Sequence, residues 1–408
     1  MSSAIKPFKI AVPDSAIEGV KNKLALATWP DEVSFSNDWS YGAPLSDIKR
    51  LASYWQSGFD WRAREAKLNE LPQFTTTITI DGFGDLDIHF VHQRSPNPNS
   101  IPLLFCHGWP GSFLEVVKIL PLLTNPSDPS SPTFHVVAPS LPNFGFSSAP
   151  TKPGFTIRHY AETCHKLMQA LGYTHYATQG GDWGFAVTRM MGLLYPTHCL
   201  ASHLNFVRVS EPPSLTTTPL LYLQHSVAPY TPEETAGLER TRWFQREGYG
   251  YNLEHSTRPS TIGLALADSP VALLAWVYEK LHDWTDAYPW TDDEVLEWIC
   301  VYQFSRAGPA ASVRIYYENM HADPGFTRGI FGYNSGVKLG LSWFPKDLIL
   351  PPRTWGRTLG PVVFERWHED GGHFAAHERP EKLVGDLREM FRGLGGKGGL
   401  VERLVAKL

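Results

Sequence analysis

The stretch THYATQGGDWGFAVTRMMGLLYP, residues 174–196, decides how the rest of the chain is interpreted. Residues 174–182 are typical of a buried strand, and residues 183–196 are typical of a helix that follows it directly. At the junction, GGDWG places Asp182 between small residues, the pattern of a sharp turn that presents a nucleophile. Small residues are expected there because the turn brings strand and helix too close together for side chains.

Asp182 is therefore the candidate nucleophile. A carboxylate is ionised at pH 7 and needs no base to begin its attack. It suits displacement of a leaving group at a saturated carbon, and the alkyl ester formed must then be hydrolysed. The pentapeptide alone fits equally well a glycine-rich turn whose aspartate caps a helix. A serine at the same spacing, Ser147 in GFSSA, is less favoured because Pro150 and a polar loop follow it instead of a helix.

Strand and helix patterns alternate around this junction. Short apolar runs at 101–106 and 134–140 predict buried strands, 113–123 is helix-like, and 158–172 is an amphipathic helix that ends on a glycine. Such alternation predicts a parallel sheet covered on both faces. From about 211 to 336 the chain is helical and rich in aromatic residues. Strand patterns return at 337–344 and 360–367, and the helix 379–394 follows.

The N-terminal part has a different pattern. Helical stripes at 13–26 and 45–59 precede two strand-like runs, 74–80 and 86–92, and a segment of turn residues, 94–100, ends this part. We therefore expect four segments. They are an N-terminal extension (1–95), the first part of an α/β core (96–212), a helical cap (213–336) and the second part of the core (337–408).

A loop after the predicted strand 101–106 belongs to the candidate site. The segment HGWPGS, 107–112, follows a predicted strand, where such a loop supplies one amide of an oxyanion hole and the residue after the nucleophile supplies the other. The candidates are the backbone N–H groups of Trp109 and Trp183. A turn rich in Gly and Pro is the alternative interpretation of this hexapeptide alone.

The order nucleophile, acid, histidine then selects Asp347, at the end of a predicted strand, and His373, 26 residues later. His373 is expected to deprotonate the hydrolytic water, and Asp347 to orient the imidazole and stabilise its charged form. The local competitors for these two roles are His368, His377, Glu365, Glu369 and Asp370.

Together with GGDWG and HGWPGS, the ending EDGGHFAAHERP (369–380) and the stretch EHSTRPSTIG (254–263) resemble the microsomal-type epoxide hydrolases, especially their soluble fungal members. DWRAREAKLNELPQF (60–74) resembles the N-terminal domain of that family, so the resemblance covers nearly the whole chain. It implies an α/β-hydrolase fold with a mostly parallel sheet, a helical cap insertion and an N-terminal extension domain.

The resemblance also implies that an epoxide and water give a vicinal diol through a covalent alkyl-enzyme ester on Asp182. Two cap tyrosines of the family, which donate protons to the ring oxygen, match Tyr251 and Tyr316, with Tyr249 and Tyr317 as neighbouring alternatives. Phenols with a pKa of about 10 are able to neutralise the alkoxide of the opened ring. Some members carry Glu at the position of Asp347, and the shorter Asp side chain changes how strongly His373 is polarised. The cap, which lines the substrate cavity, varies widely in this family, so the resemblance names the reaction and leaves the substrate open.

Two other functions stay open. A haloalkane dehalogenase shares the aspartate, the histidine and often a Trp after the nucleophile, but its halide needs N–H donors instead of a proton. A ligand-binding protein with an inactive site is the second alternative, because fold does not imply function.

Composition narrows the class of protein. A formal net charge of −5 without runs of like charge argues against a nucleic-acid partner, and 14 Trp, 16 Tyr and 22 Phe exclude disorder for most of the chain. Four cysteines without a CxxC pair predict buried, reduced thiols. The start lacks the apolar core of a signal peptide, and no stretch is long enough to span a membrane. We expect a soluble, cytoplasmic enzyme that acts on a small-molecule epoxide and needs no cofactor or metal. A homodimer is the expected assembly if the chain associates.

Overall fold

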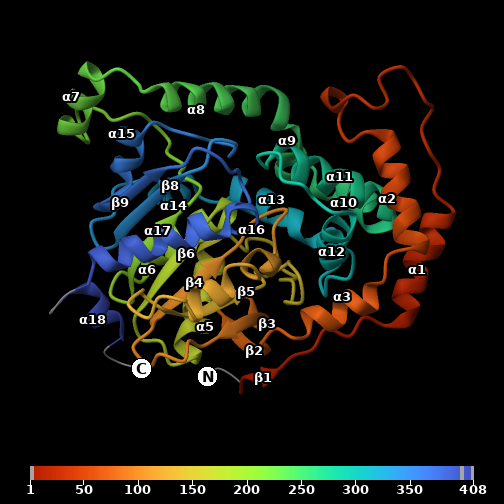
Figure 1. Cartoon of the computed structure of the whole chain (residues 1–408), viewed down its shortest axis with the longest axis horizontal. Coiled ribbons are helices and arrows are strands. Elements are labelled where there is room, and N and C mark those ends of the chain that lie inside the picture. Colours follow the sequence, from red (N-terminus) through yellow and green to blue (C-terminus); the bar gives the residue numbers. More distant parts are fainter. Residues whose placement is uncertain (1–3, 396–398, 406–408) are drawn as a thin grey trace.

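One nine-stranded sheet runs through the molecule (Figure 1). The computed structural model describes residues 4–395 and 399–405, with side chains at all of these positions except 326 and 327. The strand order is β1-β2-β3-β5-β4-β6-β7-β8-β9. Strands β4 to β9 are parallel, whereas β1, β2 and β3 add to one edge in antiparallel fashion through the pairing of β3 with β5. The predicted mostly parallel sheet is confirmed.

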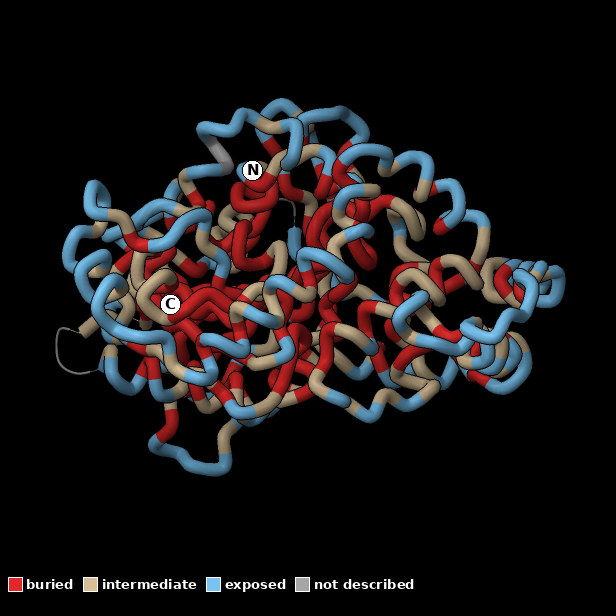
Figure 2. Tube along the Cα trace, turned by 90° about the horizontal axis from the view of Figure 1, so that it is seen from above, coloured by how far each residue is buried: buried red, intermediate tan, exposed pale blue. Residues whose placement is uncertain are grey.

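The central strands are short and buried along their whole length. All residues of β4, β5, β6 and β7 are buried, as expected for parallel strands that are covered on both faces (Figure 2). The strands are β1 Lys6–Pro7, β2 Gln73–Ile80, β3 Gly84–Gln93, β4 Ile101–Cys106, β5 Phe134–Pro139, β6 Tyr176–Gly180, β7 Cys199–Leu204, β8 Lys338–Trp343 and β9 Val362–Trp367.

Two groups of helices cover the sheet. Helices α5 (Ile157–Ala170) and α6 (Asp182–Leu194) pack on each other, and α6 also packs on β4, β6 and β7. Helix α17 (Pro380–Gly393) packs on β8, β9 and α4. Other elements that accompany the core are α4 (Leu120–Thr124), α15 (Arg353–Gly356), α16 (Ala375–Glu378), α18 (Leu400–Val405) and the short helices η2 (Phe113–Val116) and η5 (Arg357–Leu359).

The cap is the helical segment between β7 and β8 (Figure 1). No strand interrupts it in the described part of the chain, as the sequence predicted. Its elements are α7 (Pro219–Val227), α8 (Pro232–Trp243), η3 (Phe244–Gly248), α9 (Gly250–Thr257), α10 (Pro259–Asp268), α11 (Pro270–Asp283), α12 (Asp292–Gln303), η4 (Ala311–Val313), α13 (Arg314–Met320) and α14 (Pro324–Gly329).

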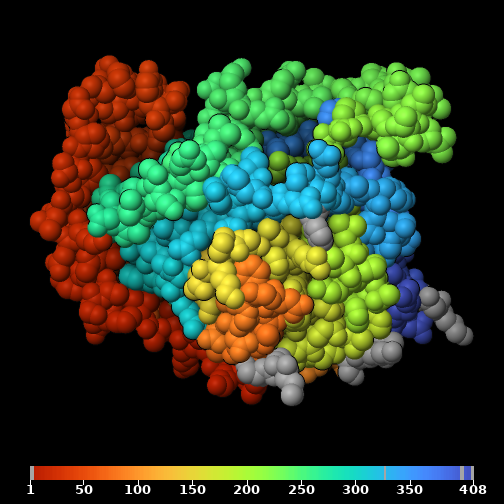
Figure 3. Space-filling model, turned by 180° about the vertical axis from the view of Figure 1, so that it is seen from behind, coloured from red at the N-terminus to blue at the C-terminus, as the bar shows by residue number. Residues whose placement is uncertain are grey.

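The N-terminal helices α1 (Asp14–Ala25), α2 (Leu45–Ser57) and α3 (Trp61–Leu68), with η1 (Trp39–Tyr41), pack against α11 and α12 of the cap (Figure 3). Arg64 forms an ion pair with Asp293 at 2.7 Å, and Trp39 stacks on His282 with ring centroids 3.5 Å apart. Because β2 and β3 of the same N-terminal part belong to the central sheet, this part connects the sheet edge to the cap. The four segment boundaries expected from the sequence stay a prediction.

Strand β7 and the segment after β4 differ from the sequence predictions for the core. Strand β7 was not predicted, because CLASHL has no β-branched residues and carries the polar Ser202 and His203, which bond to Thr178 and Ser342 inside the sheet. The prediction of one continuous helix over 113–123 is wrong. A short 3₁₀ turn, η2, and the separate helix α4 occupy this region, because Pro121 lacks an N–H donor and fits only the first turn of a helix.

All four cysteines are buried and unpaired, as predicted. Among the described residues, no single helix has the length and apolar character needed to cross a membrane. The helices α10 and α11 meet these criteria only as a pair, and that pair is bent by 114°.

Asp386 is the buried charge that fastens α17 to the sheet. Its carboxylate accepts hydrogen bonds from Ser342 Oγ and His368 Nε2, both at 2.6 Å, and from Arg366 at 2.8 Å. Burial opposes the charge, but the hydrogen bonds from His368 and Ser342 lower the pKa of Asp386 overall. Three donors therefore converge on one fully buried carboxylate: one from β8, one from β9 and one from the residue that follows β9.

We expect Asp386→Asn to lower the free energy of unfolding by about 3 kcal/mol, because it leaves buried donors without their charged partner. Since the pKa of Asp386 is lowered by folding, this contribution is present above its ordinary value of 3.8 and is lost as the pH falls through the folded value. The difference between wild type and variant should therefore shrink in acid, as measured by urea unfolding at neutral pH and near pH 3.

Glu389→Gln is the matched control, because Glu389 binds the same arginine but its side chain is 55% exposed. This change should cost less than about 1 kcal/mol. Equal losses in the two variants would contradict the role assigned to Asp386.

Candidate active site

Asp182 lies at the tip of a tight bend between β6 and α6. Its φ of +47° is in the left-handed region, which costs a residue with a side chain about 1–2 kcal/mol. A Cβ on Gly184 would lie 1.9 Å from the carbonyl oxygen of Cys106, and a Cβ on Gly180 would lie 2.4 Å from the carbonyl oxygen of Gly184. Steric contact with backbone atoms is thus the reason for small residues on both sides of the aspartate.

The two carboxylate oxygens of Asp182 have different partners. The backbone N–H of Trp109 donates to Oδ1 at 2.7 Å, whereas Oδ2 lies 3.4 Å from His373 Nε2. A Cβ on Gly108 would lie 2.1 Å from Oδ1, so only glycine lets this loop approach the carboxylate. The amide of Trp183 follows in the first turn of α6, where helical N–H groups have no partner within the helix.

His373 is held between two carboxylates. Its Nδ1 lies 2.6 Å from Asp347 Oδ1, and its backbone N–H donates to the carbonyl oxygen of Trp284 in the cap at 2.7 Å. Burial opposes protonation of the imidazole, but the Asp347 carboxylate and the hydrogen bond with Asp182 raise the pKa of His373 to about 10. The imidazole is therefore protonated at neutral pH as long as both carboxylates are ionised.

A third acidic group close to this site is Glu115. Burial raises its pKa to about 8, against the effect of the His373 charge. At pH 7 most of this carboxyl group is therefore neutral, so the charge on His373 is balanced mainly by Asp182 and Asp347.

Tyr251 on α9 and Tyr316 on α13 line the same cavity as Asp182, and their ring centroids are 5.8 Å apart. Tyr251 stacks on Trp109 at 5.1 Å, and Tyr316 meets Trp183 edge to face at 5.0 Å. Burial is the main reason that the pKa of both phenols is well above 10, so both are neutral donors at pH 7. The hydroxyl of Tyr316 is buried and makes no well-aligned hydrogen bond to any described residue, although it interacts with Tyr251 and Trp183.

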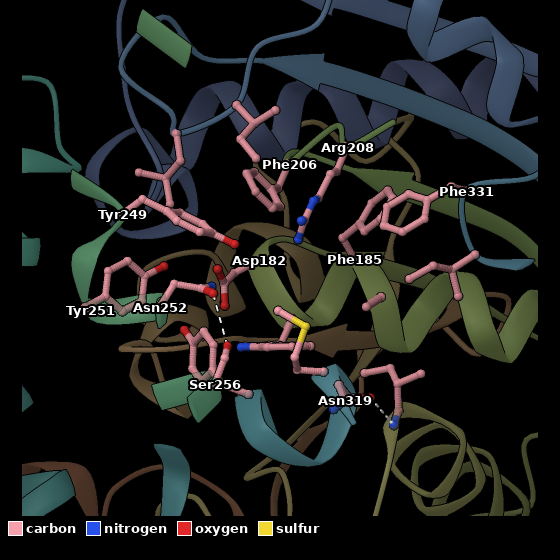
Figure 4. Close-up of a pocket in the computed structure, with 18 of the residues that line it drawn as sticks. Asp182, Phe185, Phe206, Arg208, Tyr249, Tyr251, Asn252, Ser256, Asn319 and Phe331 are labelled. Carbon is pink, nitrogen blue, oxygen red and sulfur yellow. Dashed lines mark hydrogen bonds between the residues drawn. The ribbon is translucent and has the colours of Figure 1, made fainter. Parts of the chain in front are cut away.

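A cavity of about 200 Å³ lies between the sheet and the cap, and Asp182 is among the residues that line it (Figure 4). Its walls are mainly aromatic and aliphatic. It is lined by Ile157, Asp182, Trp183, Phe185, Ala186, Phe206, Arg208, Phe244, Tyr249, Tyr251, Asn252, Ser256, Tyr316, Asn319, Met320, Ile330, Phe331, Leu348 and Ile349.

The competing histidines and serine are engaged elsewhere. His368 Nε2 donates to Asp386, and His377 Nε2 lies 3.2 Å from Lys118 and 3.5 Å from Glu294. The hydroxyl of Ser147 is buried and donates to the carbonyl oxygen of Ser140 at 2.6 Å, outside the residues that line the cavity.

The competing acids and one of the two competing tyrosines form other contacts or are exposed, whereas the other tyrosine lines the cavity. Glu365 binds Arg357, Asp370 binds Arg379 and Lys382, and Glu369 is exposed. Tyr317 is 37% exposed and stacks on His321. Tyr249, in contrast, lines the cavity next to Tyr251 (Figure 4).

Comparisons with known proteins agree with this arrangement. Residues 5–116 match the family described as "Epoxide hydrolase N terminus", and residues 101–256 match "alpha/beta hydrolase fold". A Stigmatella aurantiaca protein of the epoxide hydrolase family is 41% identical over 96% of this chain and 86% of its own length. Epoxide hydrolase 1 of Sus scrofa is 33% identical over 96% of this chain and 89% of its own length.

The chain belongs to the epoxide hydrolase family. The solved structure of Aspergillus niger epoxide hydrolase superimposes with a TM-score of 0.82 at 36% identity and covers 96% of both chains. Juvenile hormone epoxide hydrolase of Bombyx mori gives a TM-score of 0.84 at 28% identity, over 96% of this chain and 94% of that one. The family, the α/β-hydrolase fold and the enzyme class predicted from the sequence are confirmed. The site residues, the homodimer and the cytoplasmic location stay predictions.

Several residues of this epoxide hydrolase site were not predicted from the sequence. Arg208 and Phe206 follow β7, so recognition of that strand would have placed them at the same edge of the sheet as Asp182. Trp284 and Glu378 act through backbone and carboxylate contacts with the histidine loop, and no local pattern in the sequence indicates such contacts.

Glu378 fastens the histidine loop to the cap. Its Oε1 accepts the N–H of Gly372 at 2.8 Å, and its Oε2 accepts the N–H of Asp286 at 3.0 Å. Asp286 in turn accepts the N–H of Gly371 at 2.9 Å. Burial raises the pKa of Glu378 to about 7, although the two amide hydrogen bonds act against this rise. The residue before His373 is thus tied to the same cap loop as His373 itself.

We expect Glu378→Gln to lower kcat about tenfold, because the amide is able to accept only one of the two N–H bonds and the imidazole is displaced. The ester mechanism expected from the sequence then predicts a parallel fall of KM, since slower ester hydrolysis would limit turnover while ring opening would set kcat/KM. Steady-state kinetics with styrene oxide measure both constants.

Glu381→Gln, at an exposed position of α17, is the control and should match wild type. A loss of kcat/KM as large as the loss of kcat in Glu378→Gln would mean that the residue does not act through the histidine loop.

Proposed function

We propose that this epoxide hydrolase converts an epoxide to a vicinal diol in two steps, through an ester on Asp182. The observation that carries the proposal is the division of the Asp182 carboxylate. One oxygen is held by the Trp109 amide, the other lies 3.4 Å from His373 Nε2, and Asp182 lines the cavity together with both tyrosines. The printed names of the relatives support epoxide hydrolysis over dehalogenation.

In the first step, Oδ2 of Asp182 attacks a ring carbon and the carbon–oxygen bond of the epoxide breaks. The ring oxygen takes a proton from Tyr251 or Tyr316, whose phenols are neutral because burial raises their pKa. The products are an alkyl ester, a hydroxyl group on the neighbouring carbon, and a phenolate that has to be reprotonated.

Ester formation also changes the state of His373. The neutral ester removes one of the two negative charges that raise the pKa of the imidazole. The proton released by His373 restores the phenol, and His373 becomes a neutral base. The histidine therefore turns into a base only after the nucleophile has reacted.

In the second step, His373 takes a proton from water, and the hydroxide attacks Cγ of the ester. The negative charge develops on Oδ1, which already receives the N–H of Trp109, and the N–H of Trp183 in the first turn of α6 is the second expected donor. Collapse of this intermediate breaks the bond to the diol, whose oxygen takes the remaining proton, and the Asp182 carboxylate and protonated His373 are regenerated. Asp347 stabilises the imidazolium throughout.

The proposal predicts that His373→Gln accumulates the ester, because the variant opens the ring but lacks a base for hydrolysis. Mass spectrometry of the intact protein after incubation with styrene oxide should show an increase equal to the mass of the substrate. Peptide mapping should place this increase on Asp182, and Asp182→Ala should show neither the adduct nor turnover. His321→Gln, an exposed cap position, is the control.

A His373→Gln variant with the steady-state rate of wild type would contradict the assigned role of the histidine. A wild-type protein that binds styrene oxide and returns it unchanged would instead support the inactive binding protein, and halide release from a chlorinated alkane would support the dehalogenase.

The two phenols are expected to be partly redundant. Tyr251→Phe or Tyr316→Phe alone should slow ester formation about tenfold, since one donor remains, and the double change should slow it at least about 100-fold. Stopped-flow measurement of tryptophan fluorescence during a single turnover follows this step, because Trp109 and Trp183 contact the two rings.

Tyr317→Phe, next to Tyr316 but exposed, is the control. Ester formation at the wild-type rate in the double variant would exclude both tyrosines from ring opening.

A further inference from the structure

Arg208 is a cation at the mouth of the catalytic cavity. It follows β7 and is exposed, and Figure 4 shows its guanidinium directed from one side into the space that Asp182 faces. Its charge also reaches Tyr251, whose pKa it lowers, against the larger effect of burial. Arg208 therefore acts on the same space as the residues proposed for ring opening.

This guanidinium has no anionic partner among the described residues. In the described part of the chain, no ion pair or hydrogen bond connects its side chain to another group, and its guanidinium carbon lies 5.7 Å from the centroid of the Phe331 ring. Asp182 is the only acidic residue among those that line the cavity in the described part of the chain, and it lies beyond ion-pair distance.

The remaining wall next to Arg208 is apolar. Phe185, Phe206 and Phe331 surround it in Figure 4, and Ile330 continues the same wall. The cavity thus combines an apolar wall with one positive charge at its mouth. A planar guanidinium without a partner is the group that proteins use most often to bind a carboxylate through paired hydrogen bonds.

We propose that Arg208 binds a carboxylate of the substrate, and that the enzyme prefers apolar epoxides that carry such a group at the end remote from the ring. This inference rests on the proposed function. A carboxylate near Asp182 would be repelled, so the epoxide has to lie below the tyrosines while the carboxylate lies at the mouth, where Arg208 neutralises it. An apolar spacer between the two ends matches the phenylalanine wall.

The test compares two substrates of nearly the same shape, a styrene oxide with a para-carboxylate and its methyl ester. For wild type, kcat/KM should be higher for the carboxylate. In Arg208→Gln the ratio of the two kcat/KM values should fall about tenfold, and Arg208→Lys should retain part of the preference. High salt should reduce the wild-type ratio, because the site is open to solvent.

Arg246→Gln is the matched control, because Arg246 lies in the cap, pairs with Glu247 and does not line the cavity. Its ratio should equal that of wild type. A ratio that is the same in wild type and in Arg208→Gln would overturn the proposal, as would an equal loss for both substrates, which would make Arg208 a part of the wall. Failure of wild type to hydrolyse unsubstituted styrene oxide would instead contradict the proposed function itself.

Discussion

The close approach of the loop 107–112 to the first turn of α6 is the constraint on which the rest of the site depends. Asp182 adopts a left-handed backbone there, and its carboxylate reaches the Trp109 amide only because Gly108 and Gly184 leave room for it. The strain at Asp182 is offset by a charged hydrogen bond and by packing of β6 and α6. Every proposed step uses an oxygen atom whose position is fixed by this contact.

The same loop is also fixed from the cap side. Trp298 Nε1 donates to the carbonyl oxygen of Pro110 at 2.6 Å, and the hydroxyl of Tyr302 donates to that of Gly111 at 2.5 Å. Both donors lie on α12, which also contacts the N-terminal helices. The proposed oxyanion site is therefore supported by residues far apart in the sequence, and preorganised amides of this kind are effective because they need no reorganisation during the reaction.

The sequence was most informative where a backbone constraint restricts the residue type. GGDWG and HGWPGS predicted their loops because contacts of backbone atoms exclude larger side chains, and Asp347 and His373 follow strands with clear apolar patterns. β7 was missed since its polar side chains are paired inside the sheet, and Arg208 was missed with it. The contacts of Glu378 join separate segments, so only the folded chain brings them together.

The attachment of the cap determines how substrate enters the cavity and how product leaves it. Helices α1 to α3 join it on the outside, and the loops that carry Trp109 and His373 join it on the inside. A cap that is attached on both sides has little freedom for rigid-body motion. Substrate entry and product release therefore depend on the width of the cavity entrance and on rotation of the side chains around it. The side chains at the entrance, Arg208 among them, then act on a substrate before it reaches Asp182.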